Sequence, residues 1–246
     1  MLPIIQIGPI AIPTPQFSLL LAFWIGLSFA EKFSNRRGVS ADTLYNLVFT
    51  GVITGLLGAR LGYILQNSGA FIQSPQSIIS LNPGLLDPFS GLSFALIATM
   101  VYATHKKLPL WTLLDALTPF FAILMVGFAV SHIASGEAFG SETSLPWGIT
   151  LWGTKRHPTQ FYELISATTI SSLIIIYSKT EKNTGILFLR FLILTSASVL
   201  FLESFRGDSL TILGGIRNSQ ILAWISLAVT LPILTKRNAT KIEEEI

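Results

Sequence analysis

The chain has 246 residues, of which half are hydrophobic and only 12% are charged. An average soluble domain carries about twice that share of charge, so this composition excludes an ordinary soluble globule and predicts a membrane protein. The absence of cysteine excludes disulfides, thiolate metal sites and a cysteine nucleophile within the chain. A net charge of +3 is too small for a nucleic-acid-binding surface.

Seven hydrophobic segments predict transmembrane helices, because they are long and do not alternate in polarity. They cover residues 17–30, 44–65, 89–103, 110–130, 161–177, 186–202 and 216–234. The first and third are shorter than the roughly 20 residues of a usual span, so flanking residues must complete them. Residues 1–15 contain four prolines and no basic residue, so we expect no cleavable signal. The whole chain, 1–246, is expected to form one integral-membrane domain.

The distribution of lysine and arginine predicts the orientation, because cytoplasmic loops are enriched in these residues. With the N-terminus outside, the inner loops and the C-terminal tail hold ten of the 16 cations, and the outer loops hold four. The other two, Arg60 and Arg190, lie within predicted spans. The predicted fold is therefore an all-α polytopic membrane protein with seven transmembrane helices, N-out and C-in.

One outer segment, residues 131–158, is too long to be a simple turn. It is rich in glycine and proline and contains Trp147 and Trp152. Tryptophan favours the membrane–water interface, so we expect a small extracytoplasmic head, or an arm that lies on the outer leaflet.

Several charged residues lie in or beside the spans, where charge is costly. Arg60 either extends to the outer interface or lines a polar cavity, and Arg190 is expected to extend to the inner interface. Asp115, near the inner end of its span, is a candidate partner for Lys106 or Lys107.

Three clusters of polar residues lie near the outer ends of the predicted spans. The densest runs over residues 156–163 and opens the fifth span, where Gln160 and Glu163 share a helical face. Glu203 and Arg206 also share a face, which fits either a local salt bridge or a lipid headgroup site. His132 and Glu137 lie in the outer segment. The sequence has no metal-ligand spacing and no nucleotide fingerprint, so no cofactor is expected.

The order of these elements resembles the bacterial prolipoprotein diacylglyceryl transferases, over about residues 10–235. The resemblance rests on Gly-Ala-Arg-Leu-Gly-Tyr at 58–63, Gly-Leu-Ser-Phe at 91–94, Ser-Gly-Glu at 135–137 and the run 156–163, together with residues 203–208 and 218–221. It implies an enzyme of the bacterial cytoplasmic membrane that moves a diacylglyceryl group from phosphatidylglycerol to a lipobox cysteine of a prolipoprotein. The attacking thiol belongs to the substrate, so this chain needs no cysteine.

That chemistry requires a base for the thiol and cations for the phosphate. The candidate catalytic residues are His132, His157, Glu137 and Glu203. The candidate headgroup-binding residues are Arg60, Arg156, Arg206, Gln160, Tyr162 and Tyr63. The implied partners are phosphatidylglycerol, the prolipoprotein signal peptide and membrane lipids, with no nucleic acid.

The sequence departs from the family pattern at several positions associated with activity. A histidine and two glycines are replaced by Ala95, Leu96 and Ile97, and two arginines fall at Phe128 or Ala129 and at Val199. His132 occupies an asparagine position, and Phe17 occupies a tyrosine position. Two other functions therefore stay open: a catalytically altered or inactive relative that binds lipid or lipoprotein, and a small transporter. A transporter favours polar residues at mid-bilayer, whereas this chain collects them toward the outer ends.

Overall fold

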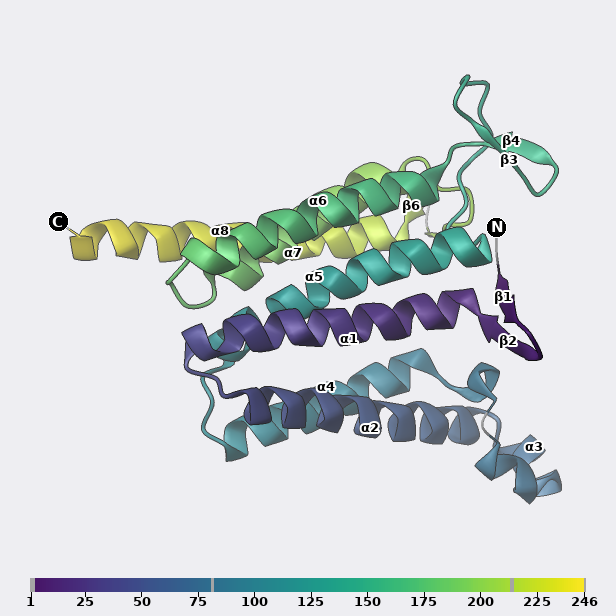
Figure 1. The fold of residues 1–246 in the computed structure, drawn as a ribbon, viewed down its shortest axis with the longest axis horizontal. Helices are drawn as coiled ribbons and strands as arrows, with labels where there is room; N and C mark the ends of the chain where they lie inside the picture. The colour runs from purple at the N-terminus through teal and green to yellow at the C-terminus, as the bar shows by residue number, and fades with distance from the viewer. Residues whose placement is uncertain (1–2, 81, 213–214, 246) are drawn as a thin grey trace. The chain divides into compact units, whose positions relative to one another are not determined.

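The computed structural model describes residues 3–80, 82–212 and 215–245, which are mostly helical (Figure 1). The described residues divide into two compact units. The first unit comprises the chain up to Arg37 and from Leu114 onward, and the second comprises Gly38–Leu113. Each unit is considered by itself.

Six of the described helices are long and apolar enough to cross a membrane. They are α1 (Thr14–Ser34), α2 (Ala41–Gln66), α5 (Leu110–Ser135), α6 (Thr159–Thr180), α7 (Ile186–Glu203) and α8 (Asn218–Glu245). The apolar part of α8 is Asn218–Ala239, and α1 is extended by η1 (Asn35–Arg37). An all-α polytopic membrane protein is thereby confirmed.

The two segments that looked short behave differently. The first is a helix of 21 residues, because Pro15 suits the first helical turn and starts α1 ahead of the apolar run. The third is α4 (Pro88–His105), a helix of 18 residues that is not among the six apolar candidates. A seventh crossing and the orientation of the chain stay predictions.

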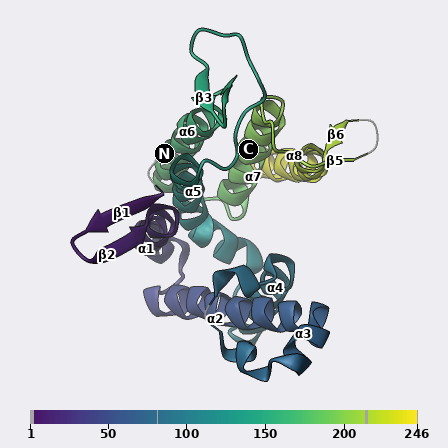
Figure 2. The same cartoon turned by 90° about the vertical axis from the view of Figure 1, so that its right-hand side faces the viewer.

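The core of the first unit lies among α5, α6 and α7. Its buried side chains are Ala122, Ile170, Ile174, Leu187 and Phe191. Helices α6 and α7 pack together, as do α7 and α8, and the three run side by side in Figures 1 and 2. Large apolar side chains such as Trp24, Ile165 and Trp224 point outward and are more than half exposed, as expected for helices whose solvent is lipid.

Asp115 holds the connection between α6 and α7. Its buried carboxylate is 2.9 Å from Arg37 Nη1 and accepts hydrogen bonds from the backbone N–H groups of Gly185 (2.6 Å) and Phe188 (2.9 Å). The prediction of Lys106 or Lys107 as its partner was wrong, because the carboxylate faces the start of α7 instead. Gly185 has a φ of 87° there, a left-handed conformation that suits glycine.

We expect Asp115→Asn to destabilise the protein by about 3 kcal/mol, because it leaves the largely buried Arg37 side chain without its counter-charge. The measurement is thermal unfolding in detergent, with the exposed Asp42→Asn as the matched control. Equal melting temperatures for the two variants would contradict this role.

Arg190 forms a second ionic contact at the same connection. Its Nη1 is 2.9 Å from Glu181 Oε2, and its guanidinium lies over the Tyr177 ring at 4.8 Å. The charge of Arg190 is thus paired near the start of α7 and is not left unpaired within the span.

The second unit is a tightly packed helical hairpin of α2 and α4. A Cβ at Gly58 would overlap the Phe94 side chain, and one at Gly62 would overlap Ser90, so both positions require glycine. Between the two helices the chain forms α3 (Ser68–Gln73), η2 (Pro75–Ile79) and η3 (Pro83–Leu85). Asp87 caps α4 by accepting from Ser90 N at 2.8 Å, and its hydrogen bonds with Ser90 lower the pKa of its carboxyl.

Three short antiparallel hairpins complete the described chain, and the sequence did not predict them. They pair β1 (Ile4–Ile7) with β2 (Ile10–Pro13), β3 (Ile149–Leu151) with β4 (Thr154–Arg156), and β5 (Thr211–Ile212) with β6 (Ile216–Arg217). The β3–β4 hairpin lies within the predicted head and turns at Trp152 and Gly153, both with positive φ. Helix α5 also continues through Ser135, so the first five residues of segment 131–158 are helical.

Candidate functional site

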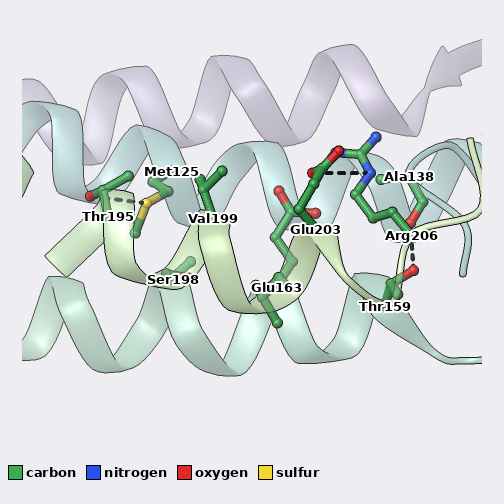
Figure 3. Close-up of a pocket in the computed structure, with 11 residues that line it drawn as sticks. Met125, Ala138, Thr159, Glu163, Thr195, Ser198, Val199, Glu203 and Arg206 are labelled. Atoms are coloured by element: carbon green, nitrogen blue, oxygen red, sulfur yellow. Dashed lines mark hydrogen bonds and ion pairs between the residues drawn. The ribbon is translucent and has the colours of Figure 1, made fainter. Parts of the chain in front are cut away.

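A cavity of about 150 Å³ opens among α5, α6 and α7 in the first unit (Figure 3). Its lining residues are Met125, Ala138, Thr159, Glu163, Ala167, Thr195, Ser198, Val199, Leu202, Glu203 and Arg206. Figure 3 shows Glu163, Glu203 and Arg206 gathered toward one end, with Met125, Thr195 and Ser198 toward the other. A cavity with charged side chains at one end and only uncharged ones at the other suits an amphipathic ligand.

His132 and Glu163 form a pair at the charged end. His132 lies in the last turn of α5, and Glu163 lies in the second turn of α6. The His132 Nδ1 and Glu163 Oε2 atoms are 2.8 Å apart, and both side chains are about one quarter exposed. A carboxylate at Nδ1 favours the neutral tautomer that leaves Nε2 as a proton acceptor.

Glu203, at the end of α7, is 3% exposed and lines the cavity. Its Oε1 accepts a hydrogen bond from Ser219 Oγ at 2.9 Å, and its Oε2 is 4.0 Å from Arg206 Nε. Glu203 and Arg206 are therefore neighbours, as predicted, but they do not share a helical face, because α7 ends at Glu203 and Arg206 follows a turn and pairs with Gly140.

Arg206 is fixed mainly by Asp208, which accepts from Nε at 3.0 Å and from Nη2 at 3.2 Å. Partial burial acts to lower the pKa of Arg206, but the hydrogen bonds and charge of Asp208, with the charges of Glu203 and Glu163, outweigh it and raise the pKa. The backbone holds the same turn, since Gly207 N donates to Phe139 O at 2.8 Å. Arg206 is thus a permanently charged, positioned guanidinium at the cavity.

Gln160 is buried next to the cavity and contacts the backbone. It is 2% exposed, and its Nε2 donates to the backbone carbonyl of Glu137 at 3.0 Å. The Glu137 side chain itself is exposed. The structure thus uses the backbone of Glu137 rather than its carboxylate.

His157 and Tyr162 belong to an aromatic cluster outside the cavity lining. The His157 ring is 5.2 Å from the Phe205 ring and 6.4 Å from the Tyr162 ring, and Tyr162 Oη accepts from Trp147 Nε1 at 2.8 Å. Among the described residues, none hydrogen-bonds to the buried His157 Nδ1. These side chains connect the head to the start of α6.

Arg156 is held within the head. Its Nε donates to Leu151 O at 3.2 Å and its Nη1 to Gly140 O at 3.3 Å, while the guanidinium lies over the Phe139 ring at 5.0 Å. These partners stabilise the head and do not bring Arg156 into the cavity lining.

Arg60 and Tyr63 lie in the second unit. Arg60 donates to the backbone carbonyls of Ile78 (3.1 Å), Leu85 (2.9 Å) and Ser77, so it organises the segment between α3 and α4. The Tyr63 ring packs edge-on against Phe71 at 6.2 Å.

We expect Arg60→Ala to increase protease cleavage within residues 74–87 by about tenfold or more, since hydrogen bonds from a charged group are worth about 1.5–3 kcal/mol each. Limited proteolysis with mass spectrometry measures the rate, and the exposed Arg36→Ala is the control. Cleavage at the control's rate would show that Arg60 does not hold this segment.

Residues 3–235 match the family model described as prolipoprotein diacylglyceryl transferase. The chain belongs to the prolipoprotein diacylglyceryl transferase family. It is 29% identical over 224 residues to the phosphatidylglycerol–prolipoprotein diacylglyceryl transferase of Clostridioides difficile, covering 90% of each chain. The transferase of that name from Nostoc sp. is 29% identical, with 93% of this chain and 86% of the relative covered, and that of Finegoldia magna is 28% identical, with 92% of each covered.

In this transferase-family chain, the cavity lining includes two of the ten predicted site residues, Glu203 and Arg206. His132 pairs with the lining residue Glu163, and Gln160 follows the lining residue Thr159 and donates to the backbone carbonyl of Glu137. Arg156, His157, Glu137 and Tyr162 have other surroundings in the same unit. Among the described residues, no three histidine, aspartate or glutamate side chains are grouped so that they could hold a metal ion.

The site residues missing from the prediction are Glu163, Asp208 and Ser219. Glu163 lay in the polar run 156–163 and Asp208 in the run 203–208, so both were visible as members of a cluster. Ser219 is 16 residues from Glu203 and carries no charge, so no local signal connected the two.

Proposed function

We propose that this chain transfers a diacylglyceryl group from phosphatidylglycerol to the cysteine thiol of a prolipoprotein lipobox. The family match over residues 3–235 and the names of the relatives support the reaction. The observation that carries the proposal for the site is that Glu163, which lines the charged end of one cavity with Arg206, pairs with His132.

His132 is proposed as the base for the thiol. With Glu163 at Nδ1, the neutral ring accepts the thiol proton at Nε2, and the carboxylate stabilises the imidazolium that forms. The thiolate sulfur then forms a bond to the terminal glyceryl carbon of the lipid. The bond from that carbon to the phosphate oxygen breaks, and its electron pair leaves with phosphoglycerol.

Arg206 is proposed to hold the phosphate. The two contacts with Asp208 use Nε and Nη2, so the remaining nitrogen, Nη1, can donate to a phosphate oxygen. A fixed cation stabilises the negative charge that increases on the leaving phosphate in the transition state. The uncharged end of the cavity, with Met125 and Val199 among its lining residues, suits the glyceryl and acyl part of the lipid.

The proposed setting is the bacterial cytoplasmic membrane, with one membrane domain of seven spans and both termini as predicted, N-out and C-in. Helix α4 then supplies the seventh crossing, and residues 131–158 form the extracytoplasmic head. In this orientation the start of α6 and the end of α7 lie at the outer face, where a secreted prolipoprotein arrives. The cation distribution supports this orientation.

The second candidate is a family member that binds lipid without transferring it. It is favoured by the small apolar side chains at Ala95 and Val199, two positions where the family resemblance implies ionisable residues. A lipid-binding protein would keep Arg206 and the cavity but would not need the His132–Glu163 pair.

A transfer assay decides between the two. The purified full-length chain in detergent is given phosphatidylglycerol and a lipobox peptide, and mass spectrometry measures the peptide. A mass gain of one diacylglyceryl unit, at a rate proportional to protein concentration, supports transfer. No gain beside an active relative from Clostridioides difficile would contradict it.

A further inference from the structure

Two hydroxyl groups line the uncharged end of the cavity. Thr195 and Ser198 are three residues apart on α7, so their side chains lie on one helical face, and both line the cavity (Figure 3). Both residues are partly buried and lie within a helix that is apolar enough to span the membrane. A hydroxyl group in such surroundings costs free energy unless it is hydrogen-bonded. The partners of these two hydroxyls therefore indicate which groups the cavity accepts.

Other serine and threonine residues of the spans bond to the backbone of their own helix. On α6, Thr169 donates to the carbonyl four residues earlier at 2.8 Å, and Ser178 does the same at 2.7 Å. Among the described residues, no backbone carbonyl accepts from Thr195 or Ser198, whose hydroxyls instead contact side chains of α5 and α6. These two hydroxyls are thus not committed to their own helix.

Ser198 shares one hydrogen bond with a second serine. Its Oγ is 2.6 Å from Ser166 Oγ on α6. Two hydroxyl groups carry two hydrogens, and the bond between them uses one. Because Ser166 lies outside the cavity lining and Ser198 is part of it, a bond donated by Ser166 leaves the Ser198 hydrogen for an acceptor in the cavity.

Thr195 donates to a weak acceptor. Its Oγ1 is 3.8 Å from Met125 Sδ, and a thioether sulfur accepts hydrogen bonds only weakly. A carbonyl oxygen from a ligand is a stronger acceptor, and the flexible methionine side chain can move aside for it. The uncharged end therefore offers two hydrogen-bond donors, three residues apart, to a bound ligand.

The distance of these donors from the charged end suits a glycerolipid. At a rise of about 1.5 Å per residue, Ser198 lies about 7.5 Å and Thr195 about 12 Å along α7 from Glu203. With the phosphate at Arg206, the glyceryl backbone and its two ester groups extend in this direction. The cavity of about 150 Å³ is smaller than the roughly 300–1,000 Å³ that encloses a whole small molecule, so it holds this part of the lipid while the acyl chains extend beyond it.

We propose that Ser198 and Thr195 select the donor lipid by donating hydrogen bonds to its acyl ester carbonyls, so that diester lipids are preferred to diether lipids. Ser166 is a positioning residue, because its bond to Ser198 directs the Ser198 hydrogen into the cavity. A diether lipid can carry the same headgroup and chains but lacks both carbonyl acceptors. This inference rests on the proposed function, because the bound lipid is the diacylglyceryl donor.

The test is a competition between two forms of phosphatidylglycerol in detergent micelles, one with two acyl esters and one with two alkyl ethers of matched chain length. Mass spectrometry of the lipobox peptide distinguishes the products, because each ether has a CH₂ group where the ester has a carbonyl. We expect the diester to be used about tenfold faster at equal concentration, the gain from two modest hydrogen bonds. Equal use, or a preference for the diether, would overturn the inference and leave the proposed function intact.

A double variant connects the preference to the two hydroxyls. Ser198→Ala with Thr195→Val should slow transfer from the diester about tenfold and leave the rate with the diether at the parent value, which a general loss of structure would lower. The control is Ser28→Ala with Thr54→Val, whose hydroxyls donate to their own helices at 3.0 Å and 2.7 Å, and it should keep the preference.

Two results would count against different claims. A preference for the diester that survives in the cavity double variant would overturn the assignment to Ser198 and Thr195. Absence of product from both donors with the parent protein, beside an active relative, would instead contradict the proposed function itself.

Discussion

Replacement of His132 by asparagine is expected to reduce kcat for diacylglyceryl transfer by about 100- to 10,000-fold, the range that general base catalysis contributes. Asparagine can still donate a hydrogen bond to Glu163, so the pairing at 2.8 Å has a neutral substitute. The KM for lipid should change little, because His132 is proposed to act on the thiol and not on the headgroup.

A pH profile separates a base from a structural residue. The variant's rate should rise with pH through the thiol pKa of about 8.5, because hydroxide then supplies the deprotonation that His132 provided. His105→Asn, at the exposed end of α4, is the control and should retain the parent profile. Parent-like kcat in His132→Asn would exclude His132 as the base.

Replacement of Arg206 by lysine is expected to reduce kcat/KM by about 100- to 1,000-fold, the usual loss when one positioned charge-stabilising donor is removed. Lysine cannot engage Asp208 with two parallel hydrogen bonds and also present a further donor in a fixed direction. The kinetic measurement varies phosphatidylglycerol at saturating peptide, with the exposed Arg36→Lys as control.

Arg206 also lies beside the buried Glu203, so folding must be checked separately. The double variant Arg206→Met with Asp208→Asn removes both charges of the close ion pair and should melt near the parent temperature while remaining inactive. An active Arg206→Lys or an active double variant would show that the guanidinium does not hold the phosphate.

The helical fold followed from local features of the sequence. Long apolar runs without alternation predict membrane helices wherever they occur, and a helix lies in each of the seven predicted segments. The hairpins did not follow, because strands of two to four residues carry too short a pattern to detect. The helices also extend beyond the predicted spans, as at Thr14 and Ser135, because the spans were taken from apolar runs and the helices continue into the flanking residues.

In the candidate site too, contacts between residues close in sequence could be predicted, and contacts between distant residues could not. The contact of Glu203 with Arg206 was predictable because the two are only three positions apart at the end of α7. The pairing of His132 with Glu163 spans 31 residues and that of Arg37 with Asp115 spans 78, so each depends on how helices pack. The family match confirmed the family resemblance, but neither distinguishes residues in the cavity from those in the head.

The most direct test of the central claim maps where the lipid headgroup binds. A phosphatidylglycerol analogue with a photoreactive group on the headgroup is crosslinked to the full-length chain, and the labelled peptides are sequenced by mass spectrometry. We expect saturable labelling, displaced by unlabelled lipid, within residues 159–167 and 195–208, which line or contact the cavity. Saturable labelling confined to residues outside these two segments and outside α5 would contradict the assignment of the cavity as the site of transfer.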